Sequence, residues 1–467
     1  MSDLLIIHKL KDIPDLLALH SSNPERYPHL LKSNASTINI ETLHNDVNNH
    51  INSRANSLSR YDILFACPQQ TLLGDNNDFL ALLDSAWIKE KQAHEGNADE
   101  KQNIELPFTG GWFLYLSYEL AQQIEPRLNL PKAEDGLPVA FATRFPSAII
   151  IDSKKQQAFL ICEAQYSQYA SLIQEDLIQY SRISYQQTFE IKDIQEDDEQ
   201  RYLAELKKLH QYIIEGDVFQ VNLSRCWKTE LIHPVSHASL FHQLSQSNPG
   251  PFNALVTLGD KAIISSSPER LIRLKKGWLE TRPIAGTRPR SSDYTVDHSL
   301  SKELLAHPKE RAEHVMLIDL ARNDLGRICK AGSINVNELM VLESYRHVHH
   351  IVSNIVGELR DDITPGQLIA AVFPGGTITG CPKVRCMEIL AELEQVGRGA
   401  YTGALGYLNH DGSMDLNILI RTITRNGDLL QFRAGGGIVI DSDPQNELKE
   451  TRSKAKGLIH ALQAGNR

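Results

Sequence analysis

The sequence predicts an α+β fold built on antiparallel β-sheets. Predicted strands neighbour other strands along the chain more often than helices, as in the succession 402–408, 413–425 and 429–440. Such an order favours antiparallel sheets over a doubly wound α/β fold. No G-x-G-x-x-G follows a strand with an acidic residue about 20 positions later, as a dinucleotide-binding α/β domain requires. The 467 residues can also bury a large core without disulfides or metals.

Residues 1–190 form the predicted N-terminal lobe. Its first 105 residues are rich in Asn, Ser and His, and they end in a polar stretch, Gln92–Asn103, that predicts a helix end or a surface loop. A Gly-Gly turn within Leu106–Pro126 leads into an aromatic-rich run and a short helix. Alternating apolar residues in Phe145–Ala164 predict two paired antiparallel strands, and a helix is expected at 166–182.

Residues 198–464 form the predicted catalytic region, where most chemical signals lie. A helix at 201–217 has apolar residues at helical spacing and stops near Gly216, and a strand rich in β-branched and aromatic residues follows at 219–231. Besides the three strands given above, strands are predicted at 252–258, 261–265, 278–282 and 349–358. Helices are predicted at 296–306, 309–325, 365–372, 383–394 and 445–463.

The composition argues against nucleic-acid and membrane partners. The formal net charge is −10, and no basic stripe with interleaved aromatic residues occurs. The sequence contains no run of about 18 apolar residues, the length that a membrane-spanning helix needs. The charges near the N-terminus lie too close together for the apolar segment of a signal peptide. The six cysteines are scattered without the C-x-x-C spacing of redox or zinc sites. A cytoplasmic protein with reduced thiols is therefore expected.

Two pairs of glutamates lie on two predicted helices. Glu310 and Glu313 are three residues apart on one helix face, and Glu447 and Glu450 repeat the spacing on the last helix. Each pair alone is more typical of a solvated face with local salt bridges. If the pairs converge, their mutual repulsion calls for a divalent cation, and ligands that are all oxygen favour Mg²⁺.

Two glycine-rich stretches are candidates for binding an anion. Pro374–Lys383 precedes a helix, and Ala434–Val439 places three glycines in a strand, where glycine marks close approach by another group. Their backbone N–H groups could face a carboxylate, but neither stretch is a Walker A motif. Arg421 lies among apolar residues in a predicted strand, so it is either exposed at the strand end or paired with a buried anion such as a substrate carboxylate.

Single residues suggest proton transfer. His350 begins a predicted strand, where a histidine is more often a hydrogen-bonded core residue, although it could act as a general acid or base near neutral pH. Glu269 follows a proline at a strand end and could equally be an ordinary turn carboxylate.

Ten segments, in order, resemble the motifs of the chorismate-binding enzymes, a family that includes anthranilate, aminodeoxychorismate, isochorismate and salicylate synthases. They are FQVNLS, SSSPERL, TRPIAGT, RAEHVMLIDLARNDLGR, VHHIVS, PGGTITGCPKVRCMEIL, GALGY, IRT, AGGGIV and LKETRSKAKGL. The match spans about 198 to 464. It implies two large antiparallel sheets packed as a sandwich with helices outside, and an active site in the cleft between them.

The resemblance also implies roles for individual residues. Glu313 and Glu450 match the magnesium ligands, with Glu310 and Glu447 beside them, and Mg²⁺ would bind the ring carboxylate of chorismate. His350 matches the active-site histidine, and Glu269 a carboxylate placed for proton transfer to the leaving hydroxyl. Matches to substrate-binding or site-lining positions are Gln220, Gly286, Thr287, Thr377, Tyr401, Arg421, Gly435, Gly436, Gly437 and Lys454.

Position 220 favours ammonia as the nucleophile. The water-using members carry a lysine base where this chain has Gln220, and a glutamine cannot accept the proton of water. An amination enzyme would need a separate glutaminase subunit as its ammonia source, because this chain shows no nucleophilic-cysteine motif of an amidotransferase. No lyase is expected in the chain either, so 4-aminobenzoate would need a separate enzyme.

The site of amination depends on conflicting signals. Members that aminate C4 of chorismate carry a lysine that attacks C2 covalently, but this chain has Ala285 there, as the anthranilate-forming members do. Asn222, PGGTITGCPK and the segments Arg60–Pro68 and Leu106–Pro126 instead resemble the C4-aminating branch. The L-L-E-S segment that binds the inhibitor tryptophan in anthranilate synthases is not found, although NPGPF (Asn248–Phe252) is similar to the second inhibitor segment.

These signals together predict C4 amination, with anthranilate formation as the alternative. A non-catalytic chorismate-binding regulator, or a subunit that only scaffolds the glutaminase, is the third interpretation. The regulator would be favoured if Glu313, Glu450, Arg421 or His350 were missing, and all four are present.

Overall fold

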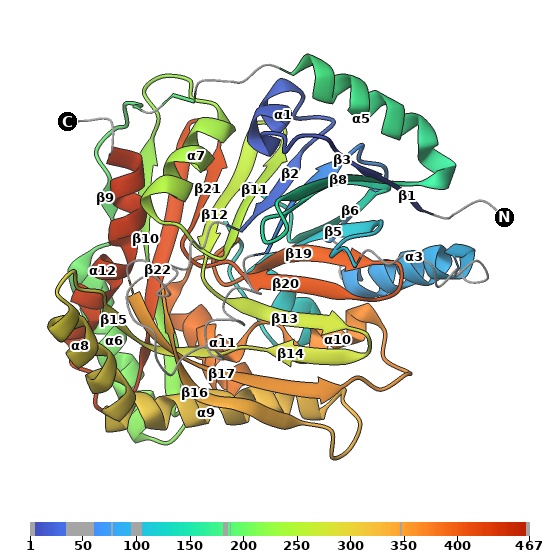
Figure 1. Cartoon of the computed structure of the whole chain (residues 1–467). Helices are drawn as coiled ribbons and strands as arrows, with labels where there is room; N and C mark the ends of the chain where they lie inside the picture. The colour runs from blue at the N-terminus through green and yellow to red at the C-terminus, as the bar shows by residue number, and fades with distance from the viewer. Residues whose placement is uncertain are drawn as a thin grey trace.

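The computed structural model describes residues 5–33, 60–75, 78–94, 105–180, 185–186, 188–345 and 348–463. These residues form two large sheets in which every pairing is antiparallel (Figure 1). Helices cover their outer faces. The predicted α+β class with a two-sheet antiparallel architecture is confirmed.

The order of the strands within each sheet differs from their order in the sequence. Sheet A, with 12 strands in the described residues, contains β1 (Leu5–Lys9), β8 (Gln157–Glu163), β7 (Ser147–Asp152), β3 (Tyr61–Ala66), β2 (His29–Lys32), β11 (Phe252–Leu258), β12 (Lys261–Ser267), β21 (Thr422–Asn426), β22 (Leu429–Ile438), β10 (Gln220–Glu230) and β18 (Gly380–Cys381), with β9 (Gln195–Glu196) beside β10. Sheet B, with 10, contains β15 (Ile284–Pro289), β17 (Val348–Glu358), β14 (Trp278–Thr281), β13 (Arg270–Lys275), β20 (Met414–Ile418), β19 (Ala404–Asn409), β5 (Gly111–Leu116), β6 (Ala140–Phe145) and β4 (Thr71–Leu73), with β16 (Asn335–Ser344) beside β17.

Both faces of the central strands are buried. In β5, Phe113 and Tyr115 pack into the core between the sheets, whereas Trp112 and Leu114 face the helices outside sheet B. Such period-2 alternation places successive side chains on opposite faces of a sheet. Because both faces pack against apolar neighbours, the sequences of these strands are nearly continuous runs of hydrophobic residues.

Helices pack in three groups. α1 (Leu16–Ser22), α5 (Ser167–Gln179), α7 (His237–Ser247) and α12 (Pro444–Gln463) cover sheet A. α3 (Phe79–His94), α9 (Pro308–Gly326) and α10 (Pro365–Val372) cover sheet B, and α8 (Tyr294–Ala306) packs against β15 and β17. α6 (Glu199–Ile214) and α11 (Lys383–Glu394) pack against β10, and the short α4 (Ala121–Ile124) precedes a loop to β6.

Most predicted elements are confirmed, and α10 and α11 have the predicted bounds. The predicted continuous strand 413–425 is wrong. The chain leaves sheet B after Ile418 and enters sheet A at Thr422, because Arg421 adopts a left-handed conformation with φ 53° that breaks the strand. The sequence analysis also missed the helices α1, α3 and α7 and the strands β1, β2, β3, β4, β6, β9, β13, β15, β16 and β18. The remainder of the polar stretch Gln92–Asn103 beyond α3, and the end of the predicted helix 166–182, lie outside the described residues.

Segments from both predicted lobes share both sheets. In sheet A, β2 pairs with β11, and in sheet B, β5 pairs with β19. None of the helices in the described part of the chain is both long and apolar enough to cross a bilayer.

Candidate active site

Two crossovers between the sheets carry Glu269 and Arg421. One leads from β12 to β13 and the other from β20 to β21, and they hydrogen-bond to each other. The backbone N–H of Ile418 donates to the Glu269 carbonyl at 3.0 Å, and that of Ser266 donates to the Arg421 carbonyl at 3.1 Å. Two residues 152 positions apart in sequence are thereby brought to the same region between the sheets.

The Glu269 carboxyl is buried and suited to proton transfer. It accepts a hydrogen bond of 2.7 Å from the hydroxyl of Thr377, which lies in the 3₁₀ turn Gly376–Ile378. Burial raises the pKa of Glu269 to about 7, against the opposing effects of this hydrogen bond and of the charge of Lys454. Near neutral pH the group can therefore exist in either protonation state, as a general acid requires.

Arg421 is half-buried, and desolvation lowers the pKa of its guanidinium. Among the described residues, no carboxylate pairs with this guanidinium. Burying a cation is costly unless an anion compensates it. The predicted role of Arg421, binding a carboxylate of the substrate, would provide this anion.

His350 and Thr287 face each other across β17 and β15. The His350 Nδ1 lies 3.0 Å from the Thr287 hydroxyl oxygen. Burial and the charge of Arg421 lower the pKa of His350 to about 3, so the imidazole is neutral at physiological pH. A neutral imidazole can orient a substrate hydroxyl or accept a proton.

A β-bulge places Ala285 next to these residues. Ala285 pairs with Ile351 and Thr287 with His350, so Gly286 is the extra residue, with φ 69°. A Cβ at Gly286 would lie 2.8 Å from a Glu310 carboxylate oxygen. The segment is thus a bulged strand rather than a simple turn. The buried Ala285 offers only a methyl group.

The two glutamate pairs interact electrostatically, and their role as metal ligands stays a prediction. Burial raises the pKa of Glu313 to about 7, against the charge of Lys309. The negative charges of Glu310, Glu447 and Glu450 raise it further, so both pairs act electrostatically on Glu313. Among the described residues, no group of three or more His, Cys, Asp or Glu side chains is arranged so that it could hold a metal ion.

Glycines 435–437 in β22 form a cradle that side chains would fill. A Cβ at Gly435 would lie 2.8 Å from both the Asn222 amide oxygen and the Tyr401 hydroxyl, and one at Gly437 would lie 2.2 Å from the Gln220 amide nitrogen. A Cβ at Gly436, which points to the opposite face of β22, would lie 3.3 Å from a Glu447 carboxylate oxygen and 3.5 Å from one of Glu450. The three glycines therefore expose backbone to Gln220, Asn222 and Tyr401 on one face and to the two glutamates on the other.

Lys454 already has partners in the site. Its ammonium donates to the Gly435 carbonyl at 3.0 Å and pairs with Glu450 at 2.8 Å. It therefore supports the cradle while it neutralises one glutamate.

Two amide oxygens in the site lack a hydrogen-bond donor. The side-chain oxygens of Gln220 and Asn222 are buried, and no described residue donates to either. The two residues are two positions apart on β10, so they lie on the same side of the strand. Buried acceptors without donors are costly, and a ligand with N–H or O–H groups would satisfy them.

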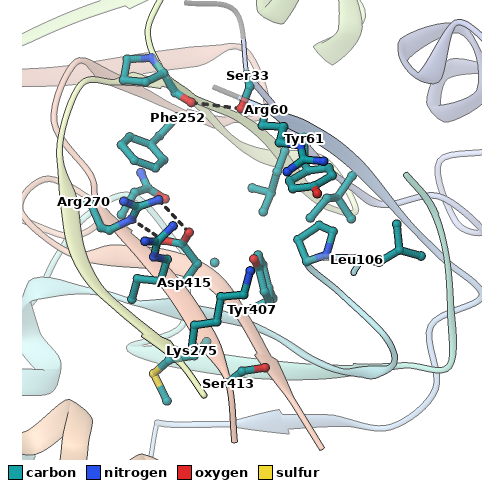
Figure 2. A pocket seen from close by; sticks show the side chains of 18 of the residues that line it. Ser33, Arg60, Tyr61, Leu106, Phe252, Arg270, Lys275, Tyr407, Ser413 and Asp415 are labelled. Atoms are coloured by element: carbon teal, nitrogen blue, oxygen red, sulfur yellow. Dashed lines mark hydrogen bonds and ion pairs between the residues drawn. The ribbon is translucent and has the colours of Figure 1, made fainter. Parts of the chain in front are cut away.

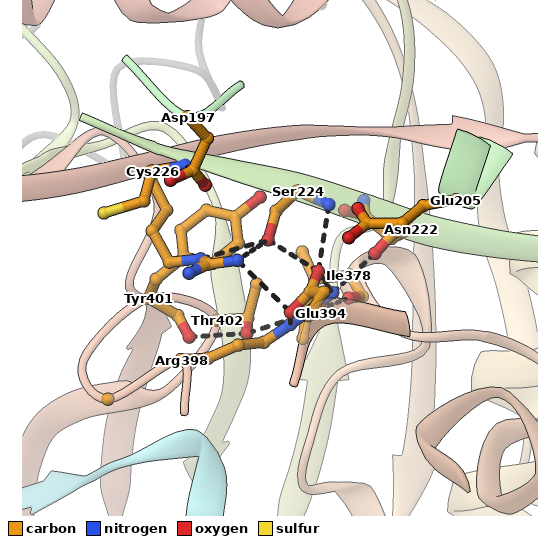
Figure 3. Close-up of polar contacts among 12 residues, drawn as sticks. Asp197, Glu205, Asn222, Ser224, Cys226, Ile378, Glu394, Arg398, Tyr401 and Thr402 are labelled. Carbon is orange, nitrogen blue, oxygen red and sulfur yellow. Dashed lines mark hydrogen bonds and ion pairs between the residues drawn. The ribbon is translucent and has the colours of Figure 1, made fainter. Parts of the chain in front are cut away.

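A buried ionic network, which the sequence analysis missed, supports this side of the site (Figure 3). Glu394 accepts hydrogen bonds of 2.7 Å from Arg398 and from Ser224. Arg398 also donates to the Asn222 carbonyl at 2.6 Å and lies over the Tyr401 ring. The only sequence signal was an E-x-x-x-R spacing, which is usually a surface pair.

A cavity of about 160 Å³ lies beside the candidate site (Figure 2). Arg270, the residue after Glu269, lines it and is held by Asp415 at 2.8 Å. Phe252 of the NPGPF segment lines the same cavity. So do Lys32 and Ser33 of the sequence LLKS, which is the L-L-E-S pattern with lysine for glutamate and which the sequence analysis did not identify.

Comparison with known proteins shows which family the chain matches. The family model described as chorismate binding enzyme matches residues 48–460. Aminodeoxychorismate synthase component 1 of Bacillus subtilis (strain 168) is 40% identical over 377 residues, which cover 78% of this chain and 80% of that protein. Anthranilate synthase component 1 of Synechocystis sp. is 38% identical over 394 residues, 77% of each chain. The crystal structure of anthranilate synthase component I from Streptococcus pneumoniae TIGR4 superposes with a TM-score of 0.75 at 29% identity, and covers 91% of this chain and 97% of that one. Relatives of similar identity therefore carry the names of two different synthases.

Proposed function

Because the chain belongs to the family of chorismate-binding enzymes, we propose that it aminates chorismate at C4, as an aminodeoxychorismate synthase component I. The overall reaction consumes chorismate and ammonia and releases 4-amino-4-deoxychorismate and water. A separate glutaminase subunit would supply the ammonia by hydrolysing glutamine, which fits the "component 1" in the names of the relatives.

The main observation that supports this proposal is the environment of the Asn222 side chain. Its buried amide oxygen has no donor among the described residues and faces the glycine cradle beside Gln220. An amide oxygen accepts hydrogen bonds from ammonia but cannot remove a proton from water, so this side of the site suits an amine nucleophile. The sequence analysis associates Asn222 with the C4-aminating branch.

The positively charged and glycine-rich elements would hold the two carboxylates of chorismate. Arg421 supplies a guanidinium that lacks an anionic partner in the described residues, and Gly435–Gly437 supply a backbone without side chains. The Tyr401 hydroxyl lies beside the same glycines. A fork-shaped guanidinium and backbone donors are well suited to bind carboxylates.

The four glutamates would provide oxygen ligands for a magnesium ion. Their oxygen-only donors match the preference of Mg²⁺, which keeps several waters and takes the remaining ligands from substrate. Glu313 and Glu450, with Glu310 and Glu447 beside them, would hold it. The ion would neutralise the ring carboxylate and help position chorismate.

Glu269 would protonate the departing hydroxyl. Attack of ammonia or water at C2 expels the C4 hydroxyl, which leaves as water with a proton from Glu269. Attack of ammonia at C4 then expels the added ammonia or water from C2, and the proton released by the new C4 ammonium group returns to Glu269. His350 and Thr287 would orient the ring from sheet B. With only a methyl group at Ala285, no side chain of that residue attacks C2, so ammonia or water takes this first step.

Ala285 is also the observation that favours the second candidate, anthranilate synthase component I. In that reaction, amination at C2 is followed by loss of pyruvate. The two candidates share the chorismate site and differ in product.

A product assay decides between them. Purified protein is incubated with chorismate, Mg²⁺ and excess ammonium at alkaline pH, with and without an aminodeoxychorismate lyase. We expect 4-aminobenzoate only when the lyase is present, and no product when EDTA removes Mg²⁺. Asn222→Val should lower the rate about 5- to 150-fold, because it removes a buried hydrogen bond of about 1–3 kcal/mol to the nucleophile. Fluorescent 2-aminobenzoate without lyase would instead identify an anthranilate synthase.

A further inference from the structure

An open groove of about 840 Å³ lies along α9, and neither Glu310 nor Glu313 of that helix lines it. It is lined by α9, the end of α10, the start of α11 and the residue before β10. Two apolar side chains at its rim are unusually exposed, Phe219 at 66% and Val315 at 48%.

A much smaller inner cavity lies between this groove and the catalytic carboxyl. Its volume is about 40 Å³, and Glu269, Thr377 and Ala321 line it. A space of this size holds one or two molecules of the size of water or ammonia. It is too small for chorismate, so only a small reactant can occupy it.

The wall between groove and inner cavity is one side chain thick. Leu320 lines the groove and touches Gly376 of the inner cavity so closely that a Cβ on Gly376 would lie 2.2 Å from it. Asp324 lines both spaces. A rotamer change of Leu320 would therefore connect them, and such changes take picoseconds to nanoseconds at accessible positions.

The junction carries balanced charge. Asp324 forms an ion pair of 2.7 Å with Lys383, and both side chains are largely buried. A lone carboxylate at this point would trap ammonium, whereas the paired lysine offsets that attraction. The junction therefore favours passage of neutral ammonia, which is the nucleophilic form.

We propose that the groove and the inner cavity form the route by which ammonia reaches Glu269 from outside the protein. This inference rests on the proposed amination of chorismate. The glutaminase would release ammonia at the groove, where Phe219 and Val315 border the opening. Ammonia would then pass Leu320 and emerge beside the carboxyl that protonates the leaving hydroxyl.

Two matched alanine substitutions on α9 test the route. Ala321→Val adds two methyl groups inside the inner cavity, and Ala312→Val makes the same change at the wide groove. The complex with the glutaminase subunit is supplied with glutamine, and glutamate and aminated product are both measured. We expect the glutamate formed per product to rise at least about fivefold in Ala321→Val, because the small cavity becomes overfilled, and to stay at the parent value in Ala312→Val. Equal ratios in both variants would overturn the proposal.

Chemical modification gives a second test that does not depend on the folding of a variant. Cys381 lines the groove, and it is the one cysteine of the six that is not buried. A bulky maleimide on Cys381 should plug the groove and raise the same ratio, whereas Cys381→Ser should be insensitive to the reagent. An unchanged ratio in the fully labelled parent would contradict the route.

Failure of the route and failure of the proposed function give different results. If the parent forms no aminated product from free ammonium, the proposed function is wrong. If the parent does form aminated product from free ammonium, but the glutamate formed per product is unchanged in the maleimide-labelled parent and in Ala321→Val, only the route is wrong.

Discussion

Glu269 shows how the environment of one residue sets the chemistry of the site. Its carboxyl is 5% exposed, and the loss of solvation raises its pKa to about 7. The single hydrogen bond from Thr377 works in the opposite direction, because it stabilises the ionised form. The residue is thereby balanced between acid and carboxylate near neutral pH.

The pH profile tests this role. If Glu269 donates the proton, the rate at a fixed concentration of free ammonia should fall about tenfold per pH unit above about pH 7, because the acid form is lost. Thr377→Val should move this falling limb to higher pH, since it removes the bond that lowers the pKa. Glu269→Gln should be about 10²–10⁴-fold slower and insensitive in this range. A limb that stays in place in Glu269→Gln would show that another group is responsible.

At the scale of elements, the bulge in β15 controls how sheet B meets α9. Gly286 has φ 69°, and its Cα faces the Glu310 carboxylate and the Leu304 side chain. A residue with a Cβ would strain the backbone and displace both neighbours. The bulge thus positions Ala285 and Thr287 on one side and a glutamate of the predicted metal site on the other.

Two glycine substitutions separate strain from contact. Gly286→Ala and Gly277→Ala both place alanine at positive φ, at a cost of about 1–2 kcal/mol each. Nothing lies within 4 Å of a Cβ at Gly277, whereas one at Gly286 would lie 2.8 Å from Glu310. We therefore expect Gly286→Ala to lower the melting temperature more than Gly277→Ala does, and only Gly286→Ala to lower the ammonium-dependent rate. Equal losses of stability and unchanged rates would mean that the contact with Glu310 is unimportant.

The whole molecule depends on contacts between its two predicted lobes. Glu119 follows β5 and accepts hydrogen bonds from the backbone N–H groups of Arg398 at 2.7 Å and Gly399 at 3.1 Å. It thus ties the N-terminal part of the chain to the loop that carries Tyr401. Burial raises the pKa of Glu119 to about 7.

This raised pKa predicts a pH-dependent stability. A carboxyl whose pKa is higher in the folded state than in the unfolded state binds more protons when folded, so its contribution is full below the unfolded value near 4.5 and is lost as the pH rises through about 7. Between pH 6 and 8, the parent should therefore lose free energy of unfolding relative to Glu119→Gln. The exposed Glu25→Gln serves as the control and should follow the parent. If Glu119→Gln also follows the parent, Glu119 is not the group that titrates.

Sequence by itself determined the class of fold, most helices and the identity of nearly all candidate site residues. Local hydrophobic periodicity predicted the helices. Residue types at motif spacing identified the four glutamates, Arg421 and His350 as candidate site residues. Local sequence did not predict the break in the strand at Arg421, because this break arises from β20 joining sheet B and β21 joining sheet A. Nor could it distinguish the Glu394–Arg398 pair from a surface pair, since burial is set by partners such as Ser224, 170 positions away.

Tertiary structure alone decided that the two glutamate pairs interact electrostatically, that Glu269 and Arg421 lie on adjoining crossovers, and that the amide oxygens of Gln220 and Asn222 lack donors in the described residues. These properties arise from contacts between distant segments, and the pKa of a buried group follows from its three-dimensional surroundings.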